Sequence, residues 1–341
     1  MKRGLAILNP AETTAADFSA RLEALRAKLR GSGNKVVLIY GDVSRSADLH
    51  YLTNLCLYWN EAVLAVPIDG NPALITKLSK RVQPWMKATT VLEDIRSTPK
   101  LAENVGKFLN ERYGACNVPV GVADMAWWPD NLIMQLRNAL PKSELNDVPG
   151  LVRDQRLAPA PEELKLLQHA ARLLNEGVES AWTEGNDANQ RTSNAVRNVR
   201  RAGFQDAYVN YTSLPDGTAY IDAIGQYSYV WVRQSRPRGG AMAHAVNDAL
   251  RAAIDAIKPG VTEQQLAGVA ASRVDGNYKQ SFSCVPAPQI ETRGMFRPGN
   301  DSRRPLKERE VVAITLSLAC EQGVVSASET MRITQQGAAA L

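Results

Sequence analysis

Only three histidines occur among the 341 residues: His50, His169 and His244. Any histidine-rich metal centre must therefore be assembled from these three. His244 stands in AHAVNDAL, near the start of a predicted helix, where an imidazole suits base catalysis near neutral pH. The alternative for His244 is a surface or half-buried helix histidine. His169 lies inside a long amphipathic segment, which indicates a structural role.

Acidic groups and one thiol are the next candidates for chemistry. Asp222 falls in the otherwise apolar stretch AYIDAIG, which leaves a functional and a structural role equally open. Asp216 belongs to Pro-Asp-Gly, a turn signal, and is expected to be structural. Cys284 stands in SFSCVPAP without a cysteine-hydrolase signature, and a nucleophilic role would require a lowered thiol pKa and a nearby base.

Three closely spaced arginines, Arg233, Arg236 and Arg238, precede the pair Gly239-Gly240. If their side chains point into a pocket, the site binds anions, because a guanidinium contacts a carboxylate or phosphate at two points. The alternative is an exposed, solvated loop. The sequence leaves both possibilities open.

Bulk composition excludes several classes of protein. The 40 Lys and Arg exceed the 35 Asp and Glu, for a net charge of +5, but no run of five or six like charges occurs. A mixed, solvated surface is therefore expected, and nucleic-acid binding is not. The four cysteines fit neither a zinc motif nor a redox pair. Without a signal-peptide pattern or an 18-residue apolar run, we expect a cytoplasmic protein with free thiols and no membrane association.

Helix and strand patterns alternate through the first 148 residues. Residues 14–31 predict a helix, because their apolar positions recur at spacings of three and four. Residues 61–76 predict a hairpin, in which two apolar runs flank a turn-forming Asp-Gly-Asn-Pro. The stretch PDNLIMQLRNALP predicts a helix capped by Asp130. This alternation indicates an α/β domain.

The remainder of the chain has a different pattern. Residues 149–160 are rich in proline and suit an interdomain linker. A long amphipathic helix is predicted from residue 161. Further on, a helix stopped by Pro-Gly precedes one capped by Thr262 with an acid in its first turn. Two or three strands are predicted to close the chain.

Four patches of sequence resemble the creatinase and Xaa-Pro aminopeptidase family. They are HYLTN at 50–54, LVRDQRLAPAPEELKLLQHAARLLNEG, ALRAAIDAIKPGVTEQQL, and PLKEREVVAITL followed by SETMRITQQGAAAL. The resemblance implies an α/β N-terminal creatinase-like domain followed by an α+β pita-bread domain. It assigns residues 1–148 to the first domain, 149–160 to the linker and 161–341 to the second domain, and it implies a homodimer.

Metal-dependent members of that family hold two divalent ions with two aspartates, one histidine and two glutamates. By the resemblance, Glu329 matches the last glutamate, while no acid stands near Leu316, where the other belongs. The stretch NYKQSFSCVPAPQ lacks the histidine, and residues 226–245 lack both aspartates. Hard divalent cations require several anionic oxygens. We therefore expect neither a metal nor another cofactor.

Within the same family, creatinase hydrolyses a C–N bond without metal. The resemblance suggests a metal-independent hydrolase or lyase of a small, anionic C–N compound, with Tyr220 nearest to the position of the creatinase histidine. Asp222, His244 and Glu329 would then converge within about 4–8 Å in a concave pocket. The residues assigned to substrate binding are Arg233, Arg236, Arg238, Glu291, Arg293 and Trp59.

Each of these assignments has an alternative. Glu291 and Arg293 would also suit an exposed loop, and Trp59 a hairpin core or dimer contact. Glu329 would also suit an ion pair with one of the arginines. The alternative for the whole chain is a non-catalytic pseudo-peptidase, acting as a binding protein or as a partner subunit for an intact relative.

Overall fold

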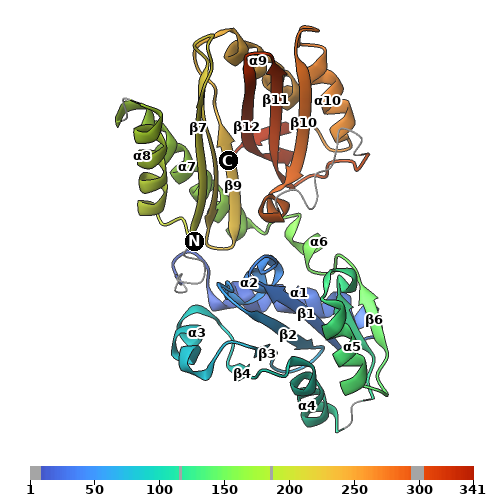
Figure 1. Ribbon diagram of the computed structural model, residues 1–341. Helices are drawn as coiled ribbons and strands as arrows, with labels where there is room; N and C mark the ends of the chain where they lie inside the picture. Colours follow the sequence, from blue (N-terminus) through green and yellow to red (C-terminus); the bar gives the residue numbers. More distant parts are fainter. Residues whose placement is uncertain (1–8, 115–116, 185–186, 293–302) are drawn as a thin grey trace. The chain divides into compact units, whose positions relative to one another are not determined.

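The computed structural model describes residues 9–114, 117–184, 187–292 and 303–341. The chain forms two compact units, Lys2–Arg156 and Leu157–Leu341, each with its own sheet (Figure 1). Their junction lies inside the proline-rich stretch 149–160. No helix in the described ranges is both long enough and apolar enough to span a membrane.

The first unit is built on a six-stranded mixed sheet in the order β4-β3-β2-β1-β5-β6. β1, β2 and β3 are antiparallel neighbours, whereas β4, β5 and β6 join in parallel. The predicted hairpin is confirmed, because β2 and β3 pair from Ala62 opposite Thr76 to Ala65 opposite Ala73. The strands are β1 (Val36–Asp42), β2 (Glu61–Pro67), β3 (Ala73–Thr76), β4 (Asp94–Ser97), β5 (Val120–Ala123) and β6 (Leu145–Val148).

Local capping explains where several helices of this unit begin. The first helix opens with a capping box, in which Thr14 and Asp17 each accept a bond from the other's backbone N–H. The predicted cap at Asp130 is wrong, because Pro129 is the N-cap and Asp130 is the first helical residue. At that position the negative charge of Asp130 interacts favourably with the helix dipole. The helices are α1 (Ala15–Gly31), α2 (Ala47–Thr53), α3 (Gln83–Thr89), α4 (Leu101–Tyr113), α5 (Asp130–Ala139) and α6 (Arg153–Arg156), with 3-10 turns η1 (Lys80–Val82) and η2 (Met125–Trp127).

The second unit is built on an antiparallel sheet in the order β10-β11-β12-β9-β8-β7, with β13 paired to β12. β9 and β12 pair only where Ser235 lies opposite Ser328. The strands are β7 (Asp206–Ser213), β8 (Ala219–Tyr227), β9 (Val230–Ser235), β10 (Lys279–Pro286), β11 (Val311–Cys320), β12 (Gly323–Thr334) and β13 (Gly337–Ala340).

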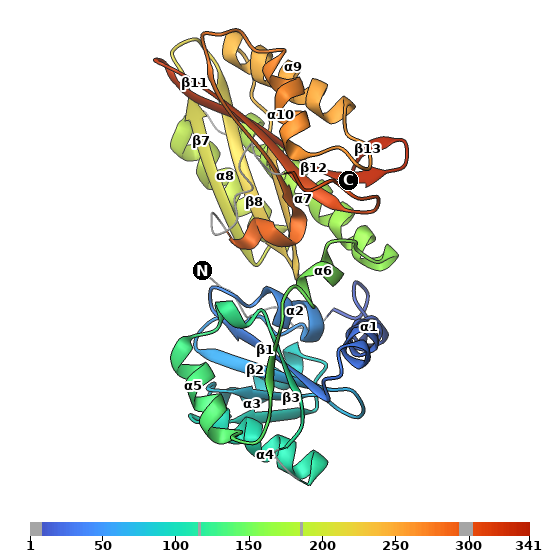
Figure 2. The same ribbon diagram turned by 90° about the vertical axis from the view of Figure 1, so that its right-hand side faces the viewer.

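Two pairs of helices cover one face of this sheet. α7 and α8 contact β7, β8 and β9, while α9 and α10 run along β10, β11 and β12 (Figure 2). The cap predicted at Thr262 is confirmed, because Thr262 and Gln265 form a capping box at the start of α10. The elements are α7 (Pro161–Glu184), α8 (Ala188–Arg201), α9 (Ala241–Asp255), α10 (Glu263–Ala271) and the 3-10 turn η3 (Ala287–Thr292).

Strand alternation gives the sheet two unlike faces. On β11, Ile314 and Leu316 are fully buried in the core that α9 and α10 complete. Thr315 and Ser317 alternate with them and therefore point to the opposite face. The fold thus separates an apolar, helix-covered face from a polar one.

Candidate functional site

Hydroxyl side chains line the face of the second sheet that points away from α9 and α10. Thr315 Oγ1 lies 2.8 Å from Ser328 Oγ, and Ser317 Oγ lies 2.7 Å from Ser326 Oγ. These bonds across β11 and β12 join four of the hydroxyls in pairs, and the hydroxyl groups themselves carry no charge. We call it the hydroxyl face. Its members are Ser235, Ser281, Ser283, Thr315, Ser317, Ser326 and Ser328.

Asp222 and Arg233 form a two-point ion pair between β8 and β9. Arg233 Nε donates to Asp222 Oδ1 at 3.2 Å, and Arg233 Nη2 donates to Oδ2 at 3.0 Å. The adjacent Gln234 bonds Asn175 on α7, so Arg233 projects from the opposite face by strand alternation. The two side chains are 25% and 24% exposed. The Asp222 carboxylate therefore lies on the face away from α7, already paired with a cation.

Glu329 lies on the other side of the sheet. Because it alternates with Ser328, it leaves β12 on the helix-covered face. There Arg236 Nη2 donates to Glu329 Oε1 at 3.3 Å, and Arg236 Nη1 donates to Asn175 Oδ1 at 3.1 Å. Asp222 and Glu329, predicted to share a site, are thus bound to different arginines on opposite faces.

The third predicted arginine has a partner of its own. Arg238 bonds the carboxylate of Glu179, and its guanidinium lies 4.7 Å from the ring centre of Trp182. Both partners belong to α7. Each of the three arginines predicted to bind substrate is therefore matched with one carboxylate of this chain.

Tyr220 and His244 do not join Asp222. Tyr220 is buried, and its hydroxyl donates to the backbone oxygen of Val324 at 3.1 Å. His244 is exposed on α9, where Ala243 and Val246 form part of the buried side instead. The predicted set of Asp222, His244 and Glu329 is thus distributed over three different surroundings, because strand alternation and helix periodicity turn the side chains apart.

The other predicted binding residues are placed as follows. Trp59 belongs to the first unit, where it is 51% exposed and its ring centre lies 5.0 Å from that of Tyr58. Glu291 belongs to η3, but its side chain lies outside the described residues. Arg293 lies outside them entirely.

Cys284 lies in the core beside a buried acid. Burial raises the pKa of the Cys284 thiol to about 12, and the charge of Glu263 acts in the same direction. Glu263 is 2% exposed, and its Oε1 has no hydrogen-bond partner among the described residues. Burial raises the Glu263 pKa to about 7, against the opposing effects of a bond to the Cys284 backbone and the charge of Arg304. A thiol in this environment is a poor nucleophile.

The donors that the structure describes in this unit do not fit a pair of divalent ions. Such ions require several anionic oxygens, whereas the hydroxyl face offers neutral groups, four of which already bond one another in pairs. The nearby acid, Asp222, is neutralised by Arg233. Within the described ranges, no three His, Cys, Asp or Glu side chains come together in a way that could hold a metal.

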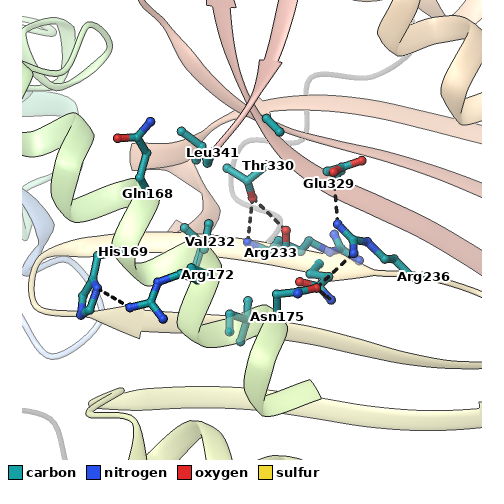
Figure 3. A pocket seen from close by; sticks show the side chains of 14 residues that line it. Gln168, His169, Arg172, Asn175, Val232, Arg233, Arg236, Glu329, Thr330 and Leu341 are labelled. Carbon is teal, nitrogen blue, oxygen red and sulfur yellow. Dashed lines mark hydrogen bonds and ion pairs between the residues drawn. The ribbon is translucent and has the colours of Figure 1, made fainter. Parts of the chain in front are cut away.

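A cavity of about 550 Å³ opens on the helix-covered side, between α7, β9, β12 and the end of the chain (Figure 3). It brings Arg236 and Glu329 together with Gln168, His169 and Arg172, which the sequence had placed only on an amphipathic helix. The amphipathic pattern of α7 does place these three residues on the polar side of the helix. No local sequence pattern predicts that the strands β9 and β12 separate beside this polar side.

Comparison with known proteins agrees with this architecture. Residues 21–158 match the family model of the creatinase/prolidase N-terminal domain. The comparison with curated proteins finds no match.

Solved structures resemble the whole chain. The X-Pro aminopeptidase from Thermotoga maritima MSB8 has a TM-score of 0.79 at 15% identity, over 93% of this chain and 96% of that one. The prolidase from Pyrococcus horikoshii OT3 has a TM-score of 0.73 at 16% identity, over 94% and 97%. The N-terminal domain of the FACT complex subunit SPT16 from Cicer arietinum has a TM-score of 0.63 at 14% identity, over 94% and 95%.

Proposed function

The chain has a creatinase/prolidase N-terminal domain and the two-domain, pita-bread fold of the creatinase and aminopeptidase P superfamily, and we propose that it is a non-catalytic member. In this role the scaffold of a peptidase serves as a binding protein or as a partner subunit. The hydroxyl face is the observation that carries the proposal.

Two physical arguments support it. Hydroxyls that bond in pairs, such as Thr315 with Ser328, supply neither the negative charge that gathers divalent cations nor a base. The Asp222 carboxylate carries charge, but a guanidinium bound at two points offsets it. A surface of this kind suits recognition by hydrogen bonds better than activation of water.

One structure with this fold is named as a subunit of a complex, the FACT subunit SPT16, and not as a peptidase. This supports the idea that the scaffold also serves within assemblies. It does not identify a partner for this chain.

The test is hydrolysis of Xaa-Pro dipeptides by the purified protein, with Mn²⁺, Co²⁺ or Zn²⁺ added in turn. We expect no turnover above that of the Asp222→Asn variant, and no metal retained after desalting, as measured by inductively coupled plasma mass spectrometry. Turnover that requires metal, together with about two metal equivalents per chain, would exclude the proposal.

Asp222 favours a second candidate, a metal-independent hydrolase or lyase of a small, anionic C–N compound. It is a partly exposed carboxylate beside Arg233, an arrangement in which the acid can move a proton while the guanidinium orients an anionic substrate. Glu329, His244 and Tyr220 would have no direct part in this version. Release of ammonia or amine from a panel of amidino and ureido acids, lost in Asp222→Asn, would favour it over the non-catalytic role.

We further propose a homodimer. The exposed ring of Trp59, 51% accessible in the single chain, supports a contact with another subunit. Light scattering after size exclusion should give twice the 37.2 kDa chain mass. Trp59→Ser should shift the protein toward the monomer, and a monomeric wild type would refute this part of the proposal.

A further inference from the structure

The helix-covered cavity begins where two strands separate. β9 and β12 pair only at Ser235 and Ser328, and beyond that point Thr330 Oγ1 bridges them by bonding the backbone N and O of Arg233. The space beside this gap, about 550 Å³, is closed on its other side by α7 (Figure 3). Its volume lies in the range typical of small-molecule sites.

A partly exposed ion pair lies on the wall of this cavity. Arg236 and Glu329 are 3.3 Å apart, and their side chains are 51% and 24% exposed. Pairs as exposed as this contribute little to stability, so a ligand that replaces both partners loses little by separating them. Arg236 uses one N–H toward Asn175 and one toward Glu329 among the contacts of the described residues, out of the five that a guanidinium carries.

The rest of the cavity combines Arg172, whose charge is already paired with Glu176, with an apolar wall. Arg172 extends from α7 toward His169, whose Nδ1 lies 3.1 Å from Arg172 Nη2 (Figure 3). The apolar lining includes Ala171, Leu174 and Val232. A ligand that fits this set carries one positive charge, one negative charge and a small apolar group.

We infer that this cavity binds a free amino acid with an apolar side chain. Its carboxylate pairs with Arg236, its ammonium group pairs with Glu329, and its side chain lies against Leu174 and Val232. Near neutral pH a free amino acid carries both charges. A ligand that carries only a carboxylate either leaves the ion pair closed or displaces Glu329, which is 24% exposed and would lose its cation. The ammonium group of an amino acid replaces that cation.

This assignment rests on the proposed binding role, but the cavity lies on the helix-covered face of the sheet, opposite the hydroxyl face. A peptidase activity on the hydroxyl face would refute the proposed function and leave the cavity untouched. Loss of amino-acid binding, in turn, would leave the non-catalytic role standing.

Isothermal titration calorimetry of the full chain tests the inference, with L-leucine, L-methionine and L-phenylalanine as probes. We expect saturable binding of at least one. For the leucine skeleton, 4-methylpentanoate lacks the ammonium group and 3-methylbutylamine lacks the carboxylate. Each should bind at least about tenfold more weakly than the amino acid, as should the amino acid to Arg236→Gln or Glu329→Gln.

Arg197→Gln is the matched control. Arg197 is 49% exposed and lies 3.8 Å from Glu184, outside the cavity, so its loss should leave binding unchanged. The inference is overturned if none of the three amino acids binds, or if 4-methylpentanoate binds as tightly as leucine. It is also overturned if Arg236→Gln binds like the wild type. The analogue comparison needs only the wild-type protein and stays decisive should a variant fail to fold.

Discussion

Arg233 and Asp222 face each other across β8 and β9, joined by two hydrogen bonds of 3.2 and 3.0 Å. Arg233 lies in residues 226–245, where the resemblance assigns two metal-binding aspartates, and its guanidinium is held beside the Asp222 carboxylate of the neighbouring strand. A cation fixed in this position repels divalent ions at short range. The same pair links two neighbouring strands, so it is also a structural contact.

The first prediction concerns the energy of that contact. Asp222→Asn and Arg233→Gln, alone and together, form a double-mutant cycle in urea denaturation. Because both side chains are about three-quarters buried and paired at two points, we expect a coupling energy of roughly 1–2 kcal/mol.

The exposed pair Arg172–Glu176, with side chains 55% and 56% accessible, is the comparison for that cycle. Its coupling should be roughly 0.3–0.5 kcal/mol, as for other surface pairs one helical turn apart. Equal coupling energies for the two pairs would contradict the prediction.

The second prediction is a pH dependence due to Glu263. Its pKa rises from 4.5 to about 7 on burial, so between these values the folded state binds the proton more tightly than the unfolded chain does. The contribution of Glu263 to the free energy of unfolding is therefore greatest below pH 4.5 and is lost as the pH rises to 7. Glu263→Gln should be more stable than wild type at pH 8, by up to about 3 kcal/mol, with no gain at pH 4.

The control for this measurement is Glu162→Gln. Glu162 also lies in the first turn of a helix, α7, but its side chain is 54% exposed. Its substitution should leave the difference between pH 4 and pH 8 nearly unchanged in chemical denaturation. A Glu263→Gln variant with the wild-type pH profile would show that the buried acid does not titrate as stated.

The third prediction concerns thiol reactivity. Cys284 is 2% exposed with a pKa raised to about 12, whereas Cys320 is partly exposed. Native protein treated with iodoacetamide at pH 8 should therefore carry label on Cys320 long before Cys284. Peptide mass spectrometry measures both sites, and denatured protein shows that each can be labelled. Equal native rates would contradict the burial and the raised pKa stated for Cys284.

The fourth prediction tests the packing of β8 beneath α7. A Cβ on Gly225 would lie 2.5 Å from Cδ1 of Phe204, so Gly225→Ala forces a ring in the core to move. We expect a loss of about 1–3 kcal/mol in unfolding free energy. Gly268→Ala makes the same chemical change in α10, where nothing from outside that helix, among the residues described, lies within 4 Å of the new Cβ. There we expect a gain of about 0.5–1 kcal/mol. Losses of similar size at both sites would be inconsistent with this account.

Local sequence patterns do not predict every element of the fold. HYLTN carries a family resemblance but no helix signal, yet it lies largely in α2, a helix of one to two turns that tertiary packing must hold. The sequence KQSFSCVP does not predict the strand β10, because it mixes polar and apolar residues. β10 forms because it pairs with β11, where Phe282 lies opposite Leu316.

What the sequence by itself determined is local: the capping box at Thr262, the hairpin at 61–76, and the order of elements that indicated two domains. Caps and turns of this kind depend on interactions among a few neighbouring residues, so they can be recognised without knowledge of the tertiary structure. Only the tertiary structure decided which side chains meet. Arg236 pairs with Glu329 across 93 positions, and Asp222 faces away from both, because a strand sends neighbouring residues to opposite faces. Which face becomes a site depends on where β9 and β12 part and on the helix that covers them.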